Sequence, residues 1–235
     1  MSNIANEKVL HLFSGGLDSL AAFYLLKAEH PIELLFISYG QKALRMERKH
    51  ANAVAEKYLC KLHQVTLPWY RSISNLSPLT GAQAGIPQDL DLEDKTALKK
   101  SAAAVWLPNR NGLFLNIAAS IAEAAGIERV GAGFNSEEGE TFPDNTIEFV
   151  EAANAFFKIS TSSSVRMLTP VIKMKKDEIA GIIRDHDGYD LFYSCYAGGS
   201  KMCGRCESCL RAIRAFRKIG RQSEVSARFD ADFIA

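Results

Sequence analysis

The stretch Ser14-Gly15-Gly16-Leu17-Asp18-Ser19 (SGGLDS) decides the fold, because it joins a strand pattern to a helix pattern. The apolar run before it, Lys8 to Phe13 (KVLHLF), is typical of a buried strand, and Asp18 to Glu29 carries apolar residues at helical spacing. The same patterns predict two further strands and a helix between them: Ile32 to Tyr39, Lys61 to Leu67 and Ala43 to Leu59. Alternating strands and helices indicate a parallel sheet with right-handed crossovers.

The residues of this loop suit it to hold an anion. Gly15 and Gly16 allow a tight turn whose backbone N–H groups approach a phosphate closely, and the following helix N-terminus adds partial positive charge. The hydroxyls of Ser14 and Ser19 can donate to phosphate oxygens, while Asp18 can cap the helix or hold Mg²⁺. A Walker A loop would carry a lysine on the phosphates, which this loop lacks. We therefore expect a phosphate-binding loop of another class.

The segment 71–101 departs from the regular alternation. It holds Pro78, Pro87 and an acidic-polar run from Asp89 to Lys95. We interpret it as a long insertion, partly mobile, with a role at a site or an interface. Regular patterns resume after it, with helices expected over 112–125, 147–159 and 175–184 and strands over 128–133 and 168–172.

Four of the five cysteines fall in one cluster with the spacing Cys195-x7-Cys203-x2-Cys206-x2-Cys209. Two short C-x-x-C steps can bring thiolates to about 2.3 Å from one Zn²⁺, and four thiolates would leave that ion no open position. We therefore expect a structural zinc site; the alternatives are an iron–sulfur cluster, a redox pair or buried free cysteines. Cys60 is isolated, and we expect it to be a small buried hydrophobic residue.

Composition narrows the class of protein. The 28 basic and 27 acidic residues among 235 give a net charge of +1, which argues against a protein that coats nucleic acid. With 47% hydrophobic and 23% charged residues the chain is typical of a globular protein. We expect no signal peptide, no membrane span and a cytoplasmic location, because neither a basic start before an apolar run nor a long uncharged apolar stretch occurs.

The SGGxDS pattern resembles the hallmark of the PP-loop ATP pyrophosphatase superfamily. That resemblance implies an α/β fold that is Rossmann-like (adenine nucleotide alpha hydrolase-like), with a parallel sheet and helices on both faces. It implies that ATP binds with its pyrophosphate in the loop and that AMP is transferred to a substrate oxygen. We divide the chain into a PP-loop domain over residues 1–190, with its insertion at about 71–101, and a C-terminal zinc-binding segment and tail over 191–235.

Further motifs narrow the resemblance to the 7-cyano-7-deazaguanine synthase (QueC) family, from about residue 8 to about 215. They are the cysteine cluster, Tyr39-Gly40-Gln41, Pro108-Asn109-Arg110-Asn111 and Phe142-Pro143-Asp144. The resemblance implies that ATP adenylates the carboxylate of 7-carboxy-7-deazaguanine and that ammonia then displaces AMP to give an amide. A second activation dehydrates the amide to the nitrile that is used for queuosine. A homodimer is implied by the resemblance alone.

Roles follow from matching these motifs residue by residue. The expected catalytic residues are Ser14, Asp18, Ser19 and Lys176, with Lys176 on the leaving pyrophosphate. The expected ATP-binding residues are Phe13, Ser14, Gly15, Gly16, Leu17, Asp18, Ser19, Tyr39, Gly40 and Gln41. The deazaguanine pocket is expected to comprise Arg110, Asn111, Phe142 and Asp144, and Asp144 can accept from the paired donors of a guanine-like edge. Zinc would be held by Cys195, Cys203, Cys206 and Cys209.

Because this sequence departs from the family pattern in two motifs, functions other than the reaction with ammonia remain alternatives. The family usually reads PGRN and C-E-T-D-x-S-G-Y-P-D-C-R, whereas this chain has Asn109 within PNRN and the run 135–146 reads NSEEGETFPDNT. One alternative is transfer of the activated acyl group to a protein amine, as in defence-associated relatives. Two others are a tRNA-thiolating adenylase and a zinc-ribbon nucleic-acid module built on the cations Arg205, Arg211, Arg214, Arg217 and Lys218. We expect no direct nucleic-acid partner.

Overall fold

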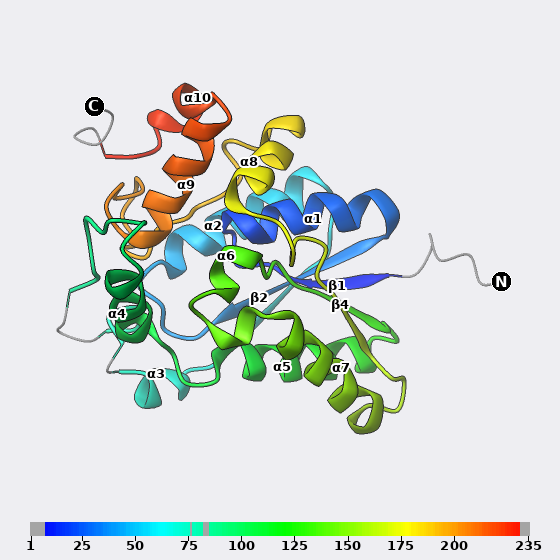
Figure 1. The fold of residues 1–235 in the computed structure, drawn as a ribbon. Helices are drawn as coiled ribbons and strands as arrows, with labels where there is room; N and C mark the ends of the chain where they lie inside the picture. The colour runs from blue at the N-terminus through cyan, green and yellow to red at the C-terminus, as the bar shows by residue number, and fades with distance from the viewer. Residues whose placement is uncertain (1–7, 76, 82–84, 231–235) are drawn as a thin grey trace.

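A computed structural model describes residues 8–75, 77–81 and 85–230, and its centre is one five-stranded parallel sheet (Figure 1). The strands are β1 (Val9–Leu12), β2 (Ile32–Ser38), β3 (Leu62–Thr66), β4 (Arg129–Gly131) and β5 (Arg166–Leu168). Their order is β3-β2-β1-β4-β5, with Leu12 of β1 opposite Leu35 and Val9 opposite Arg129. The predicted parallel sheet is confirmed.

The order of the strands reverses beside β1. The chain builds β1, β2 and β3 in one direction and then crosses to β4 and β5 on the other side of β1. In open parallel sheets, ligands bind at such a switch point, outside the carboxyl ends of the strands. The SGGLDS loop follows β1 directly, so the fold places it at this position.

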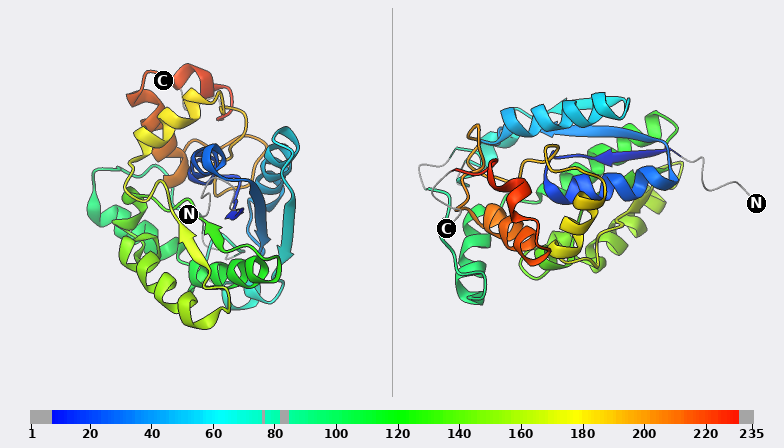
Figure 2. Two further views of the ribbon diagram at one scale, coloured as in Figure 1. Left: turned by 90° about the vertical axis from the view of Figure 1, so that its right-hand side faces the viewer. Right: turned by 90° about the horizontal axis from the view of Figure 1, so that it is seen from above.

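Helices cover both faces of the sheet, as predicted. The helices are α1 (Leu17–Glu29), α2 (Leu44–Lys57), α3 (Tyr70–Ile73), α4 (Lys95–Val105), α5 (Arg110–Ala124), α6 (Ser136–Gly139), the 3-10 turn η2 (Pro143–Asn145), α7 (Ile147–Ser160), α8 (Lys176–Asp185), α9 (Glu207–Lys218) and α10 (Gln222–Ser226). Two views show α1 and α8 on one side of the sheet and α5 and α7 on the other (Figures 1 and 2).

The alternation of side chains along the central strands creates two hydrophobic cores. Leu34 and Phe36 of β2 pack with α1, α2, α8 and α9, whereas Leu35 and Ile37 pack with α5 and α7. Because both faces are covered, β2 is apolar nearly throughout and buried over its whole length. Apolar residues near the C-terminus, such as Phe192 and Phe216, belong to the first core, so this part of the chain packs directly on the helices that cover that face of the sheet.

Two predicted segments differ in the structure. The strand expected over 168–172 is wrong at both ends, since β5 begins two residues earlier at Arg166, ends four residues earlier at Leu168, and is followed by turns up to Lys173. The expected insertion over 71–101 contains the start of α4, whose N-terminus is capped by the Asp94 carboxylate. The part of the insertion at 76 and 82–84 lies outside the described residues, and its mobility and the domain boundary at 190 stay predictions. None of the described helices is long and apolar enough to cross a membrane.

Candidate active site

The SGGLDS loop is held in its turn conformation by its own hydroxyls. Gly15 has φ of +78°, and a Cβ there would lie 2.7 Å from the Glu47 carbonyl oxygen, so only glycine fits. The Ser14 hydroxyl accepts from the Gly16 N–H at 3.2 Å and lies 3.2 Å from the Ser19 hydroxyl. The Ser19 hydroxyl donates to the Gly16 carbonyl at 3.0 Å. These contacts fix the hydroxyls and the start of α1 around one point.

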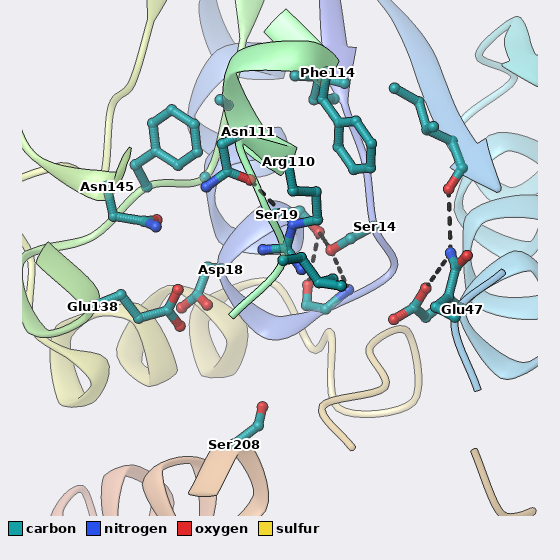
Figure 3. Close-up of a pocket in the computed structure, with 18 of the residues that line it drawn as sticks. Ser14, Asp18, Ser19, Glu47, Arg110, Asn111, Phe114, Glu138, Asn145 and Ser208 are labelled. Atoms are coloured by element: carbon teal, nitrogen blue, oxygen red, sulfur yellow. Dashed lines mark hydrogen bonds between the residues drawn. The ribbon is translucent and has the colours of Figure 1, made fainter. Parts of the chain in front are cut away.

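A buried charge cluster stands beside this loop. The Lys176 ammonium donates to the Asp18 carboxylate at 2.5 Å and to the Glu138 carboxylate at 2.8 Å, and its side chain is 6% exposed. Figure 3 shows the carboxylates of Asp18 and Glu138 turned toward one another. One cation therefore serves two carboxylates, which leaves the cluster with a net negative charge.

The ionisation of the cluster follows from its burial. Burial raises the pKa of Asp18 to about 6, although the Lys176 charge acts to lower it. Burial also acts to raise the pKa of Glu138, but Lys176 and Arg211 outweigh it and hold that pKa at about 2. The two carboxylates hold the pKa of Lys176 above its usual range against the effect of burial. Near neutral pH the cluster is an ammonium with two carboxylates.

Asp18 has a free buried oxygen that fits a metal ion. Its Oδ2 accepts from Lys176, while its Oδ1 is buried and has no hydrogen-bond partner among the described residues. A buried carboxylate oxygen is costly to leave without a partner, and carboxylate oxygens are ligands that Mg²⁺ prefers. The residues present therefore fit a magnesium ion that would be bound together with phosphates.

The turn after β2 places Gln41 and its partner Glu47 beside the SGGLDS loop, held by hydrogen bonds. Gln41 accepts from the Tyr39 N–H at 2.9 Å and donates to the Ile37 carbonyl at 3.2 Å and to Glu47 of α2 at 2.9 Å. Burial raises the pKa of Glu47 to about 7, against the lowering effects of Gln41 and Arg110. Glu47 is thus a carboxyl group poised to be protonated or ionised near neutral pH.

The predicted deazaguanine residues come together from two segments. Asn111 of α5 donates to the Asp144 carbonyl at 3.3 Å, which ties the start of α5 to η2. Arg110 lies 3.4 Å from the Tyr39 hydroxyl, and its guanidinium lies over the Tyr39 ring. Burial raises the pKa of Asp144, while Arg110 acts to lower it.

One cavity of about 250 Å³ unites these groups (Figure 3). Its lining includes most predicted residues: Phe13, Ser14, Gly16, Leu17, Asp18, Ser19, Tyr39, Gln41, Arg110, Asn111, Phe142 and Asp144. Of the residues predicted to bind ATP or to take part in catalysis, Gly15, Gly40 and Lys176 are not part of the described lining. Lys176 reaches the cavity through Asp18 and Glu138, which both line it.

The four clustered cysteines form a group that could hold one metal ion. Their Sγ atoms all lie within 4.8 Å of one another, and Cys203 Sγ lies 3.9 Å from Cys209 Sγ. Tetrahedral Zn–S bonds of about 2.3 Å require sulfurs about 3.8 Å apart, so the set fits one ion. A multi-iron cluster places iron and sulfide between its ligands and needs a wider spacing. Gly204, with φ of +74°, forms the turn that lets the Cys206 N–H donate to Cys203 Sγ at 3.3 Å.

The metal site is joined to the phosphate loop by two consecutive residues. Tyr193 N–H donates to the Gly15 carbonyl at 2.7 Å, and the Ser194 hydroxyl accepts from the Leu17 N–H at 3.2 Å. The Cys209 thiol lies 3.1 Å from the Ser194 carbonyl, and Cys195 follows directly. The cysteine segment is thus one wall of the cavity as well as a metal site.

Comparison with known proteins agrees with this geometry. Residues 8–220 match the family described as "Queuosine biosynthesis protein QueC". The chain is 41% identical over 211 residues to the 7-cyano-7-deazaguanine synthase of Carboxydothermus hydrogenoformans, covering 89% of this chain and 98% of that protein. It is 42% identical over 217 residues to the 7-cyano-7-deazaguanine synthase of Pelotomaculum thermopropionicum, covering 91% and 98%. The chain belongs to the QueC family.

A solved structure shares the fold of this QueC family member at low identity. It is the U34-tRNA thiolase NcsA from Methanococcus maripaludis with its 4Fe-4S cluster, with a TM-score of 0.50 and 16% identity. The match covers 97% of this chain and 72% of that one. It supports the Rossmann-like α/β fold class and nothing finer.

Several residues of the site escaped the sequence analysis. Glu47, Glu138 and Ser194 line the cavity, and Glu137 accepts from the Lys176 N–H at 2.9 Å. Glu137 also binds Arg211 and Arg214 of α9. The glutamates at 137 and 138 stand in the run NSEEGE, whose acidity before an expected helix was the available signal. Glu47 lies in a charged helical pattern and carries no signal of its own.

Proposed function

We propose that this chain is an ATP-dependent 7-cyano-7-deazaguanine synthase, which adenylates 7-carboxy-7-deazaguanine and reacts it with ammonia. The observation that carries the proposal is that the SGGLDS loop and the Arg110–Asn111–Asp144 group line one cavity. A site for the pyrophosphate of ATP and a site for a guanine-like edge therefore open into the same space. Curated relatives that align over nearly the whole chain carry this name.

The loop and its neighbours serve the adenylation step. The substrate carboxylate attacks the α-phosphorus of ATP, and the bond to pyrophosphate breaks, which gives an acyl adenylate. The N–H groups at the start of α1 and the hydroxyls of Ser14 and Ser19 are placed to hold the departing pyrophosphate. A magnesium ion bound at Asp18 would neutralise charge on the phosphates. Lys176 fixes the Asp18 carboxylate through its ammonium group.

The second half of the reaction uses the acyl adenylate. Ammonia attacks the acyl carbon and AMP leaves, which gives the amide and releases a proton. The amide oxygen then attacks the α-phosphorus of a second ATP and pyrophosphate leaves. The adenylated amide loses AMP, and with both N–H protons released it becomes the nitrile. Asp144 would accept from the donors at the guanine-like edge, and Arg110 and Asn111 would hold Asp144 and the ring in place.

Four sulfurs of the metal site suit Zn²⁺ in a structural role, since no ligand position stays open for chemistry. The homodimer and the cytoplasmic location remain predictions from the sequence. No observation favours the alternative in which a protein amine, and not ammonia, accepts the activated acyl group.

The test is mass spectrometry of products from ATP, 7-carboxy-7-deazaguanine and ammonium. We expect the amide or the nitrile together with AMP and pyrophosphate. ADP and phosphate without AMP would exclude adenylation. Consumption of ATP with neither product, while a protein gains the mass of the deazaguanine acyl group, would replace ammonia by a protein acceptor.

A further inference from the structure

Two aromatic rings of the cavity lie nearly parallel. Trp106 follows α4 and Phe142 precedes η2, and both line the cavity. Their ring centroids lie 6.3 Å apart and their planes are inclined by only 12°. The two rings come from segments far apart in the sequence, so the fold and not the local chain sets this arrangement.

The spacing of this pair differs from that of a core pair. The stacked rings of Phe192 and Phe216 are fully buried and lie 5.7 Å apart. Trp106 is 36% exposed and stands further from its partner ring. A ring inserted face to face between two others needs their centroids about 7 Å apart, twice the best carbon–carbon separation of about 3.5 Å, so the centroids of this pair must part by at least about 0.7 Å. Trp106 can move outward because it lies beyond the helix end with one side in solvent.

Polar side chains that could form hydrogen bonds with the edge of a bound ring lie close in sequence to both aromatic residues. Asp144 follows Phe142 by two positions, and Arg110 follows Trp106 by four. The hydrogen bond from Asn111 to the Asp144 carbonyl joins the two segments. A planar ring held by its faces between the aromatic residues would therefore have its edge near Asp144.

We propose that Trp106 and Phe142 form an aromatic clamp that stacks on the two faces of the deazaguanine ring. The proposal rests on the proposed function and adds Trp106 to the substrate-binding residues. Stacking holds any planar bicyclic ring, since every base has a π face, whereas the edge contacts of Asp144 select among such rings. ATP also carries a planar ring, but the residues that flank the clamp in sequence, Arg110 and Asp144, are those expected to bind the deazaguanine, so we assign the clamp to that ring.

Tryptophan fluorescence tests the clamp directly. The chain has two tryptophans, and Trp69 is 51% exposed and does not line the cavity. In a Trp69→Phe background, the emission reports Trp106 alone. We expect 7-carboxy-7-deazaguanine to quench this emission, and a non-hydrolysable ATP analogue to leave it nearly unchanged. Quenching by the ATP analogue alone would assign the clamp to adenine and overturn the proposal.

Variants at Trp106 give the second measurement. Trp106→Leu should raise the KM for 7-carboxy-7-deazaguanine about tenfold or more, and Trp106→Phe should stay within a few-fold of wild type. Unchanged ATP binding by Trp106→Leu would show that the variant is folded. An unchanged KM in Trp106→Leu, while the wild type converts the substrate, would overturn the clamp and leave the function intact. No binding and no turnover of the compound by the wild type would overturn the proposed function, and the clamp with it.

Discussion

At the scale of single residues, Asp18 is the group whose role is most open to test. Asp18→Asn keeps the size of the side chain and can keep a hydrogen bond with Lys176, but it removes the charge that a magnesium ion needs. We expect adenylation to slow by about a hundredfold, the typical loss for one strong electrostatic group. Release of pyrophosphate, followed over a range of Mg²⁺ concentrations, measures this effect.

The matched control for Asp18 is Asp185→Asn, which removes an exposed carboxylate that pairs with its neighbour Arg184 at the surface. It should leave the rate unchanged. A near wild-type rate for Asp18→Asn would show that the free Asp18 oxygen does not hold a catalytic ion.

Asp144 separates substrate recognition from ATP binding. A hydrogen bond to a charged group contributes about 1.5–3 kcal/mol, so Asp144→Ala should weaken binding of 7-carboxy-7-deazaguanine about ten- to a hundredfold. ATP binding should be nearly unchanged, because the loop lies on another strand. Calorimetric titration with each ligand measures both quantities. Equal losses for both ligands would indicate that Asp144 supports the cavity as a whole and does not read the ring edge.

Glu47 gives the protein a predictable pH dependence of stability. Its pKa is about 7 in the folded protein against an ordinary value of 4.5, so between these values the folded state holds a proton that the unfolded chain has lost. The free energy of unfolding should therefore fall as pH rises from about 4.5 to about 7, by at most about 3 kcal/mol for this group. Asp18 acts in the same direction, so the comparison must be made with a variant.

Glu47→Gln removes this contribution while keeping the contact with Gln41. Its denaturant unfolding should show a flatter dependence on pH and a higher free energy of unfolding than wild type at pH 8. Glu56→Gln, on the exposed face of the same helix, is the control and should follow the wild-type profile. If both variants track wild type, Glu47 is not a protonated group of the folded protein.

Sequence patterns could predict the cavity residues that belong to short motifs. They could not predict residues that line the cavity only because the folded chain buries them there. Ser14, Asp18 and Arg110 lie in short motifs where few residue types serve. Glu47 and Glu138 belong to runs of ordinary charged residues, and only tertiary contacts bury them beside the cavity. No pattern along the chain marks such a residue, because burial depends on what packs against it.

At the scale of elements, Glu137 joins three helices. From α6 it accepts from the Lys176 N–H of α8 at 2.9 Å and from Arg214 of α9 at 2.5 Å, and it also contacts Arg211. Its side chain is 15% exposed. Glu137→Gln should lower the free energy of unfolding by about 2 kcal/mol, as for loss of hydrogen bonds to charged groups.

Glu93→Gln is the matched control, because Glu93 pairs with the same Arg214 at 3.6 Å but is 86% exposed. Exposed pairs contribute about 0–1 kcal/mol, so this variant should unfold almost as wild type does. Equal effects for the two variants in denaturant unfolding would show that Glu137 does not brace these helices.

The segment between β3 and α5 shows where element-scale prediction fails. Its irregular composition indicates an insertion, but nothing in it indicates where it docks. In the structure Arg205 of the cysteine segment donates to Asp89 at 2.9 Å, and Ser101 of α4 donates to Glu207 of α9 at 2.8 Å. These partners lie more than a hundred positions further along the chain, a separation that local patterns cannot bridge.

At the scale of the whole molecule, the parallel sheet was predictable because most of its strands and the helices between them carry a periodic signal. The contact between the SGGLDS loop and the cysteine segment could not be predicted, because it joins residues 15–17 to residues 193–194, which are far apart in the sequence. The loop sits at the switch point of the sheet, and the cysteine segment closes that end of the cavity. We therefore expect folding of the segment to complete the proposed ATP site.

Loss of the metal should then disturb ATP binding as well as stability. Structural zinc binds with about 10 kcal/mol or more in small peptides, so Cys206→Ser should lose the metal and loosen the segment that holds Gly15 and Leu17. We expect about one zinc per wild-type chain by elemental analysis, and in the variant faster hydrogen exchange at residues 15–19, with weaker ATP binding. Exchange in α7, on the opposite face of the sheet, should change less.

Cys60→Ser is the matched control, since Cys60 is a half-buried free thiol outside the cluster. It should keep its metal, its ATP affinity and its loop protection. Iron and sulfide in the wild type would exclude zinc. A metal-free Cys206→Ser protein that binds ATP as wild type does would break the link from Cys195 through Ser194 to Leu17. In that case the hydroxyls and turn of the SGGLDS loop would suffice by themselves to shape the ATP site, and the metal would stabilise the C-terminal segment alone.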